Sequence, residues 1–226
     1  MFRNAASRLV PVAIATLWVG VGSALAFEPV DQSRSVHGFV IVPQCGQVAF
    51  DDEEAEGFEP FGARAGATGD CDSASARAVA GQRSSISQVD LMARGRAASR
   101  ADASLLDIIH AIADSTYSVT FEVETQTQYT LRGLISAAAS DDNIVVLAGA
   151  TVRLVDAVGQ VLADYAVEPG PGGALQRVVV DQRGILEPGE HTLTTTATTV
   201  IDNEVPPSRA ANATFELLFR TLPDAP

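Results

Sequence analysis

The residues best suited to chemistry are the carboxylates of the segment from residue 45 to residue 72. Four acids stand in a row and two more flank a cysteine: Asp51, Asp52, Glu53, Glu54, Asp70 and Asp72. Calcium prefers oxygen ligands of this kind, in sets of roughly six to eight. The spacing departs from the EF-hand pattern, and runs of like charge on a loop are usually solvated. We therefore interpret residues 45–72 as an acidic surface loop that could hold calcium.

Two cysteines enclose this acidic segment. Cys45 and Cys71 are the only cysteines of the chain, and an even number in an exported protein predicts one disulfide, which would close the loop at its base. The chain-entropy model assigns about 3–4 kcal/mol to a loop of this length. A cysteine metal site is disfavoured because neither residue has a partner in a CxxC or CxxH pattern.

The chain shows no local signature of catalysis. His37, His110 and His191 have no paired metal-ligand spacing, and the nucleophile motif GxSxG is absent. His191 follows a Pro-Gly turn, so we expect its ring to pack at a sheet corner and bond a carbonyl. A carboxylate pair of the glycosidase type depends on separation in space, which the sequence does not give. No catalytic residue is assigned.

Aromatic residues give little support to carbohydrate binding. Sugar-binding faces display flat rings, usually of tryptophan or tyrosine. Tyr117, Tyr129 and Tyr165 fall at alternating positions expected to be buried. Phe58 and Phe61, in the acidic segment, are the rings that could be exposed, although packing onto the fold is favoured for phenylalanine.

The first 26 residues have the form of a secretory signal peptide. Arg3 and Arg8 precede an apolar run from residue 9 to residue 21, and small residues precede a cleavage point before Phe27. This segment also contains Trp18, the single tryptophan. The run is short for a membrane span, so an uncleaved anchor is the less favoured alternative. We expect a secreted or periplasmic protein without a membrane span once the signal is removed.

Composition narrows the range of partners. The chain has 226 residues, 46% of them hydrophobic, which is enough for a buried core. Its 28 acidic residues outnumber 15 basic ones, all of them arginine, for a net charge of −13. Nucleic acids and anionic membranes require clustered positive charge, so both are disfavoured as partners. The sequence does not identify the partner, for which a glycan or an envelope protein is a candidate.

Alternating apolar and polar residues predict an all-β fold. The clearest example is residues 116–124, where Tyr117, Val119 and Phe121 share one face. The predicted strands cover residues 38–42, 88–99, 116–124, 128–136, 144–155, 161–167, 175–181, 191–200 and 213–219. Turns at intervals of about ten residues predict a single antiparallel β-sandwich over residues 27–226, jelly-roll-like in arrangement. Residues 27–36 are expected to be a flexible lead-in.

One segment departs from this alternation. Apolar residues recur at helical spacing in Leu105, Ile108, Ile109 and Ile112, and Ser104 with Asp107 could form a capping box. A short helix over residues 105–113 and a strand running into residues 116–124 are equally favoured.

The strand motifs resemble those of secreted β-sandwich proteins of environmental bacteria, many of which carry a C-terminal Pro-Glu-Pro sorting signal. The similarity covers residues 78–221, and its best match is GILEPGEHTL from Gly184 to Leu193, where the family pattern has tyrosine at the position of His191. The resemblance implies export and a sandwich fold and implies no activity. Residues 221–226 provide no apolar span or basic tail, so anchoring by that route is not expected.

The sequence therefore favours an exported, non-enzymatic β-sandwich with a structural or adhesive role in the cell envelope or outside the cell. A calcium-assisted carbohydrate-binding module that uses residues 45–72 is the first alternative. A hydrolase with a carboxylate site assembled from distant residues is the second.

Overall fold

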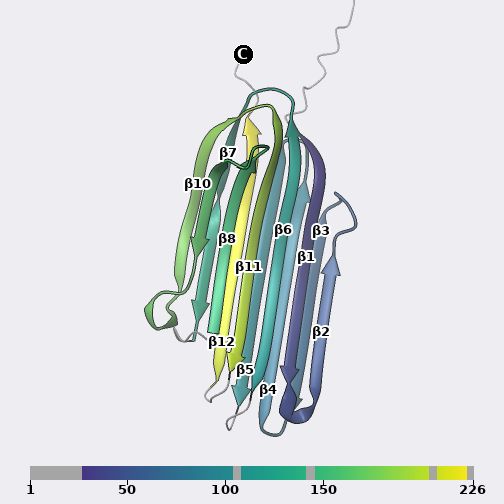
Figure 1. Cartoon of the computed structure of the whole chain (residues 1–226), viewed down its shortest axis with the longest axis vertical. Helices are drawn as coiled ribbons and strands as arrows, with labels where there is room; N and C mark the ends of the chain where they lie inside the picture. The colour runs from purple at the N-terminus through teal and green to yellow at the C-terminus, as the bar shows by residue number, and fades with distance from the viewer. Residues whose placement is uncertain (1–26, 104–107, 141–145, 204–207, 223–226) are drawn as a thin grey trace, which may run out of the picture.

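The computed structural model describes residues 27–103, 108–140, 146–203 and 208–222, which form a sandwich of two antiparallel six-stranded sheets (Figure 1). Sheet A has the strand order β2-β1-β6-β11-β8-β9, and sheet B has the order β10-β7-β12-β5-β4-β3. The strands are β1 (Glu28–Val42), β2 (Gln47–Glu54), β3 (Phe61–Cys71), β4 (Ala74–Ile86), β5 (Asp90–Ala103), β6 (Ile109–Val123), β7 (Thr127–Ala139), β8 (Val146–Asp156), β9 (Val161–Val167), β10 (Gln176–Leu186), β11 (Gly189–Asn203) and β12 (Arg209–Leu222), with two short 3-10 helices, η1 (Pro43–Cys45) and η2 (Pro171–Gly173).

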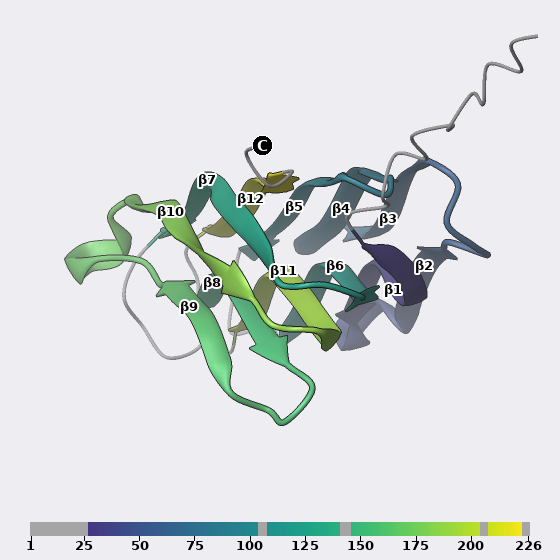
Figure 2. The ribbon, with the colours of Figure 1, turned by 90° about the horizontal axis from the view of Figure 1, so that it is seen from above.

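The predicted all-β sandwich of two antiparallel sheets is confirmed. Most connections between successive strands pass from one sheet to the other, which is the jelly-roll-like feature of the chain path. Figure 2 looks along the strands and shows the two layers facing each other. No helix in the described part of the chain has the length and hydropathy needed to cross a membrane.

Side-chain alternation determines which residues lie between the sheets. In β6 every odd-numbered residue from Ile109 to Val123 is buried, and the even-numbered residues face outward. The predicted inward faces of Tyr117, Val119 and Phe121 are thereby confirmed, and Phe215 and Phe219 of β12 are buried in the same way.

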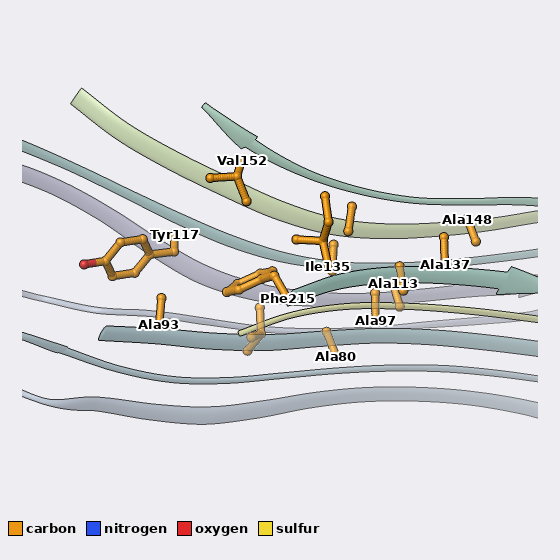
Figure 3. Packing of buried hydrophobic residues seen from close by; sticks show 14 of the residues in the cluster. Ala80, Ala93, Ala97, Ala113, Tyr117, Ile135, Ala137, Ala148, Val152 and Phe215 are labelled. Carbon is orange, nitrogen blue, oxygen red and sulfur yellow. The ribbon is translucent and has the colours of Figure 1, made fainter. Parts of the chain in front are cut away.

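The core changes in character along the strands. Aromatic rings fill one end, where the centroid of Phe121 lies 4.8 Å from that of Phe27 and 5.2 Å from that of Phe219. Alanine dominates elsewhere, as Ala80, Ala97 and other buried alanines show in Figure 3. Small side chains from facing sheets allow close packing of the backbones, so the interior has little room for larger groups.

Two parts of the sequence-based interpretation are wrong, and one alternative that the sequence left open is decided. Residues 45–72 are not an irregular loop, because they contain η1, β2 and β3 with a short connection over residues 55–60. Residues 28–36 are not a flexible lead-in, because they form the first part of β1 and pair with β6. Of the two alternatives that the sequence favoured equally, the strand is confirmed over residues 109–113, because their backbone pairs with β1 and β11. Residues 105–107 and the expected signal peptide, residues 1–26, lie outside the described residues.

A buried arginine connects β1 to the 55–60 connection. Arg34 is 1% exposed, and its guanidinium donates hydrogen bonds to the carbonyls of Gly57 and Glu59 and to Ser84 Oγ. Burial lowers the pKa of Arg34, and Tyr117 opposes this effect. The carbonyl oxygens thus replace the carboxylate that a buried cation usually requires.

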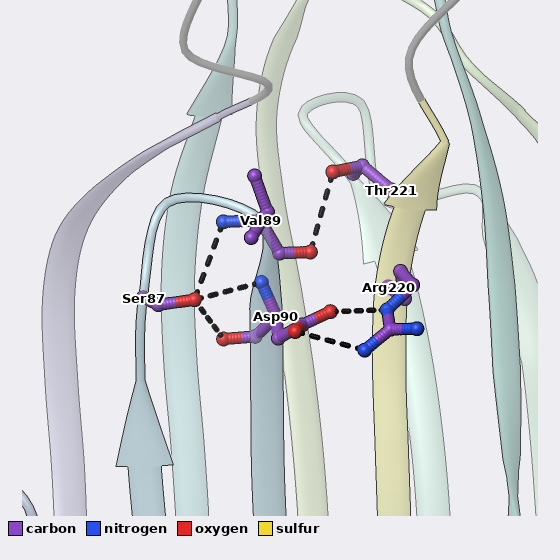
Figure 4. A network of polar contacts seen from close by, with 5 residues as sticks. All are labelled: Ser87, Val89, Asp90, Arg220 and Thr221. Carbon is purple, nitrogen blue, oxygen red and sulfur yellow. Dashed lines mark hydrogen bonds and ion pairs between the residues drawn. The ribbon is translucent and has the colours of Figure 1, made fainter.

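The two ends of the described fold meet at one turn. The amide of Phe27 donates to the carbonyl of Gln88 at 3.3 Å, and the amide of Thr221 donates to the carbonyl of Val89 at 3.1 Å. The side chain of Thr221 also bonds the Val89 carbonyl (Figure 4). Residues 27 and 221 therefore lie beside each other at the same end of the sandwich.

We predict that Gly95→Ala destabilises the protein by about 1–3 kcal/mol, because a Cβ there would overlap the ring of Phe215 and Ser115 Oγ. Gly66→Ala is the matched control, since a Cβ there has its nearest neighbours at 4.0 Å. Its free energy of unfolding should remain within about 0.5 kcal/mol of the wild type. Urea unfolding measures both variants, and equal stability of the two would contradict the close packing at Gly95.

The pH dependence of stability provides a second test. Burial raises the pKa of Tyr117, with Arg34 acting in the opposite direction, whereas an unfolded tyrosine ionises near pH 10. The native state therefore retains this proton longer, and stability that is complete below about pH 10 is lost as the pH rises further. At pH 11 the loss from Tyr117 is about 1.4 kcal/mol. The chain has no lysine and both cysteines are paired, so few other side chains titrate in this range.

Tyr117→Phe should remove the part of the stability loss at alkaline pH that comes from Tyr117. The hydroxyl of Tyr117 has no hydrogen-bond partner among the described residues, so the variant should match the wild type at pH 7. Guanidinium unfolding between pH 7 and pH 11 measures the difference. If the free energies of unfolding of the two proteins fell equally between pH 7 and pH 11, Tyr117 would not be the cause of the alkaline loss of stability.

Candidate functional site

Arginine side chains gather on the outer face of sheet B. Seven of them line one hollow of about 960 Å³: Arg64 of β3, Arg77 and Arg83 of β4, Arg94, Arg96 and Arg100 of β5, and Arg177 of β10. Glu216 is the single acidic residue in the lining. We call this site the arginine hollow. In a chain whose net charge is −13, it is a concentrated region of opposite sign.

Strand register places several of these arginines directly opposite one another. Arg77 of β4 pairs with Arg100 of β5, and Arg83 pairs with Arg94. Like charges at directly opposed positions of an antiparallel pair are destabilising. The fold therefore carries two such cross-strand pairs, six residues apart along β4 and β5.

Small residues form the floor of the arginine hollow. Gly81 lies opposite both Arg64 and Arg96, and Ala98 lies between Arg96 and Arg100 on the outer face of β5. A Cβ at Gly81 would have its nearest neighbour, the carbonyl of Ala63, at 3.6 Å. The absence of a side chain at this position is thus not required by packing, and it leaves space between the arginines.

Neutralisation within the arginine hollow is incomplete. Arg94 lies 3.7 Å from Glu216, with both side chains largely exposed, and Arg96 donates to Oδ1 of Asn212 at 3.3 Å. Arg100 forms an ion pair with Asp102. Within the described residues, the remaining four arginines of the hollow have no ion pair: Arg64, Arg77, Arg83 and Arg177. Their guanidinium donors are therefore available to a bound anion.

Acidic residues of β5 stand at its two ends. Asp90 accepts two hydrogen bonds from Arg220, at 2.6 and 3.1 Å (Figure 4). Asp102 accepts a bond from Arg100 at 2.8 Å, which raises the pKa of Arg100 and lowers that of Asp102. Both carboxylates are thus already paired with these arginines, and neither of them neutralises Arg94 or Arg96.

Sequence reasoning missed this site because it used the net charge of the whole chain. The argument that positive charge is not clustered fails on the structure, since arginines from four strands meet on one face. Part of the signal was present in β5, where residues 94, 96 and 100 share the outward face at even spacing. The contribution of β3, β4 and β10 required the strand order.

The predicted calcium ligands are not assembled into one site. Asp51, Asp52, Glu53 and Glu54 are consecutive in β2, so neighbouring side chains point to opposite faces. One oxygen of Asp51 accepts a bond from the amide of Gly66 at 2.9 Å. Asp70 ends β3, and Asp72 lies in the turn that follows. Across the described ranges, no three histidine, cysteine or acidic side chains are close enough to hold a metal together.

The predicted disulfide is confirmed. Cys45 of η1 and Cys71 of β3 are bonded, across a separation of 26 residues. Gln47 reinforces the link, because its side-chain amide exchanges two hydrogen bonds with the backbone of Asp70. The edge of sheet A is thereby joined to the edge of sheet B.

The histidines have structural surroundings. Nε2 of His191 lies 2.9 Å from the carbonyl of Glu187, so this nitrogen is the donor. The ring is 3% exposed and stacks on Phe121 with a centroid distance of 5.8 Å. The predicted corner position of His191 is confirmed. His110 lies 3.1 Å from Asp202, and His37 stacks on Phe39.

Comparison with known proteins gives a general similarity. No family model and no curated protein sequence matches the chain. Among solved structures, an enzymatically active domain of tailspike protein 4 from bacteriophage CBA120 is similar at 9% identity and a TM-score of 0.26, covering 64% of this chain and 19% of that domain. The Gt strain of infectious bursal disease virus is similar at 8% identity and a TM-score of 0.27, covering 87% of this chain and 72% of that one. The chain thus spans about a fifth of the tailspike domain.

We predict that the opposed arginines are unnecessary for stability. The double variant Arg77→Gln, Arg83→Gln removes one charge from each opposed pair, so at low ionic strength its free energy of unfolding should equal or slightly exceed that of the wild type. The difference should vanish near 0.5 M salt, where exposed charges are screened over roughly 4 Å. Urea unfolding at the two salt concentrations measures this.

Arg220→Gln is the matched control on the same face. It removes the paired bonds to Asp90 and should lower stability. A loss in the double variant as large as in this control would mean that the arginines of the hollow hold the fold together.

Proposed function

We propose that the protein is an exported, non-enzymatic β-sandwich with an adhesive role in the cell envelope or outside the cell, and that the arginine hollow binds an acidic polymer there. The observation that carries this proposal is the pair of arginine oppositions across β4 and β5, Arg77 with Arg100 and Arg83 with Arg94. Arg94 and Arg100 already have carboxylate partners, so a bound anion would supply the counter-charge that Arg77 and Arg83 lack.

The extent of the arginine hollow favours a polymer over a small anion. Arg64 lies on β3 and Arg177 on β10, at opposite edges of sheet B. Five strand spacings separate these edges, or about 24 Å. A single phosphate or sulfate would contact only a few of the arginines, whereas an extended polyanion would contact them in succession.

Arginine suits such a ligand better than other cations. Its planar guanidinium presents paired donors that match the two oxygens of a carboxylate, sulfate or phosphate. The exposed side chains can adjust to the spacing of a polymer, and binding would release counterions from both surfaces. The affinity should therefore fall steeply as salt is added.

Export supports an extracellular ligand. The disulfide between Cys45 and Cys71 fits an oxidising compartment, and the likeness to secreted bacterial sandwiches agrees with it. Acidic polymers are abundant in cell envelopes and matrices, where a protein with a net charge of −13 would approach them with its positive face forward.

We predict binding to dextran sulfate and to inorganic polyphosphate, and none to neutral dextran, in about 20 mM salt. The double variant Arg77→Gln, Arg83→Gln should weaken binding to both polyanions about tenfold or more, because two charge-assisted contacts are lost. Isothermal titration calorimetry measures the affinity. Arg153→Gln is the matched control: Arg153 is an exposed arginine on the outer face of sheet A and should have no effect.

A neutral variant tests the shape of the site. Gly81→Leu would fill the floor of the arginine hollow without changing the charge. Gly149→Leu is the control, because it places the same side chain on the outer face of sheet A. A Cβ at Gly149 has its nearest neighbour at 3.8 Å, so packing there permits it as well. Binding should weaken in the first variant alone. Equal affinities for all these variants, or no binding of either polyanion, would overturn the proposed function.

A further inference from the structure

A second hollow adjoins the arginine hollow. It measures about 490 Å³ and shares three side chains with its neighbour, Arg83, Arg94 and Glu216. The two spaces therefore form one continuous surface across the outer face of sheet B. A ligand in contact with Arg83 or Arg94 can extend in either direction.

The lining of this second hollow is mainly apolar. Its side chains include Pro60, Phe61, Met92 and Leu217, and we call it the apolar hollow. Met92 is 51% exposed and lies between Asp90 and Arg94 on the outer face of β5. Leu217 is 4% exposed and forms part of the floor. An apolar surface thus lies directly beside a strongly basic one.

The buried Arg34 holds one wall of the apolar hollow in place. It bonds the carbonyl of Glu59 at 2.9 Å, directly before Pro60, and its guanidinium carbon lies 5.6 Å from the centroid of the Phe61 ring. Four hydrogen bonds from Arg34 to Gln32, Ser84, Gly57 and Glu59 fix this connection relative to β1 and β4. A wall that is already ordered costs little conformational entropy when a ligand binds.

We infer that the ligand of this surface is an acidic polysaccharide. Its carboxylates or sulfates contact the arginine hollow, and the apolar C–H face of one of its sugar rings lies on Pro60, Phe61 and Met92. This inference rests on the proposed function and specifies its ligand. Among extended polyanions, a polysaccharide carries both a charged group and an apolar face on the same ring, as the two adjoining hollows require.

A single-stranded nucleic acid is the alternative occupant, and the lining disfavours it. Base stacking uses an open aromatic plane, whereas Phe61 is half-buried with Arg34 against it, and the other contacts are aliphatic.

The test compares a polyanion built on pyranose rings with polyanions that lack them. Met92→Gln replaces an exposed apolar side chain with a polar one of similar length, and Leu147→Gln is the matched control, because Leu147 is 55% exposed on sheet A. Titrations use dextran sulfate, inorganic polyphosphate and single-stranded DNA in about 20 mM salt. We expect Met92→Gln to weaken dextran sulfate binding about threefold to tenfold, without affecting polyphosphate binding. Leu147→Gln should affect neither.

Phe61→Ala is a second variant at the same site, and a urea unfolding curve accompanies it to show that it folds. It should reproduce the selective loss for dextran sulfate. Equal effects of Met92→Gln on both polyanions, or no effect on either, would overturn the sugar contact and leave the proposed function intact. Tighter binding of DNA than of dextran sulfate would identify the alternative occupant and also overturn the inference. Failure of the wild type to bind any polyanion would instead refute the proposed function.

Discussion

The face-to-face packing of the two sheets is the constraint on which the rest of the structure depends. Each strand contributes alternate side chains to a narrow interior rich in alanine, and a shift of one residue would move charged side chains into it. The register is therefore fixed along the full length of the sandwich. Once the inward faces are fixed, so are the outward ones, and the positions of the arginines on sheet B follow from the packing of the core behind them.

The strands that alternate large apolar residues with polar ones could be predicted from the sequence, and the strands that lack this alternation could not. Residues 116–124 and 213–219 alternate large apolar with polar residues, so both their extent and their buried faces are recognisable. The strands β3 and β4 alternate alanine with glycine, serine or arginine, and alanine and glycine favour neither a strand nor a buried position strongly. Four consecutive acids in β2 obscured its pairing with β1 in the same way.

The candidate site was less accessible to sequence reasoning than the fold. The outward position of Arg94 and Arg96 follows from the alternation in β5. The opposition of Arg77 to Arg100 depends on the turn that joins β4 to β5, and the approach of Arg177 depends on the order of strands in the sheet. A total charge sums over both faces, so it conceals the arginines that gather on the outer face of sheet B. The acids predicted to act together are separated for a related reason, because neighbours along a strand point away from each other.

The meeting of residues 27 and 221 at the turn that contains Gln88 and Val89 makes the folded chain almost a closed ring in space. Such a ring has no structurally privileged starting point. A short linker could join the two ends and new ends could be opened at another surface turn, which gives a circular permutant with the same core. For the same reason, the whole sandwich could be inserted into a loop of a host protein, with little change in the separation of the two residues that flank the insertion.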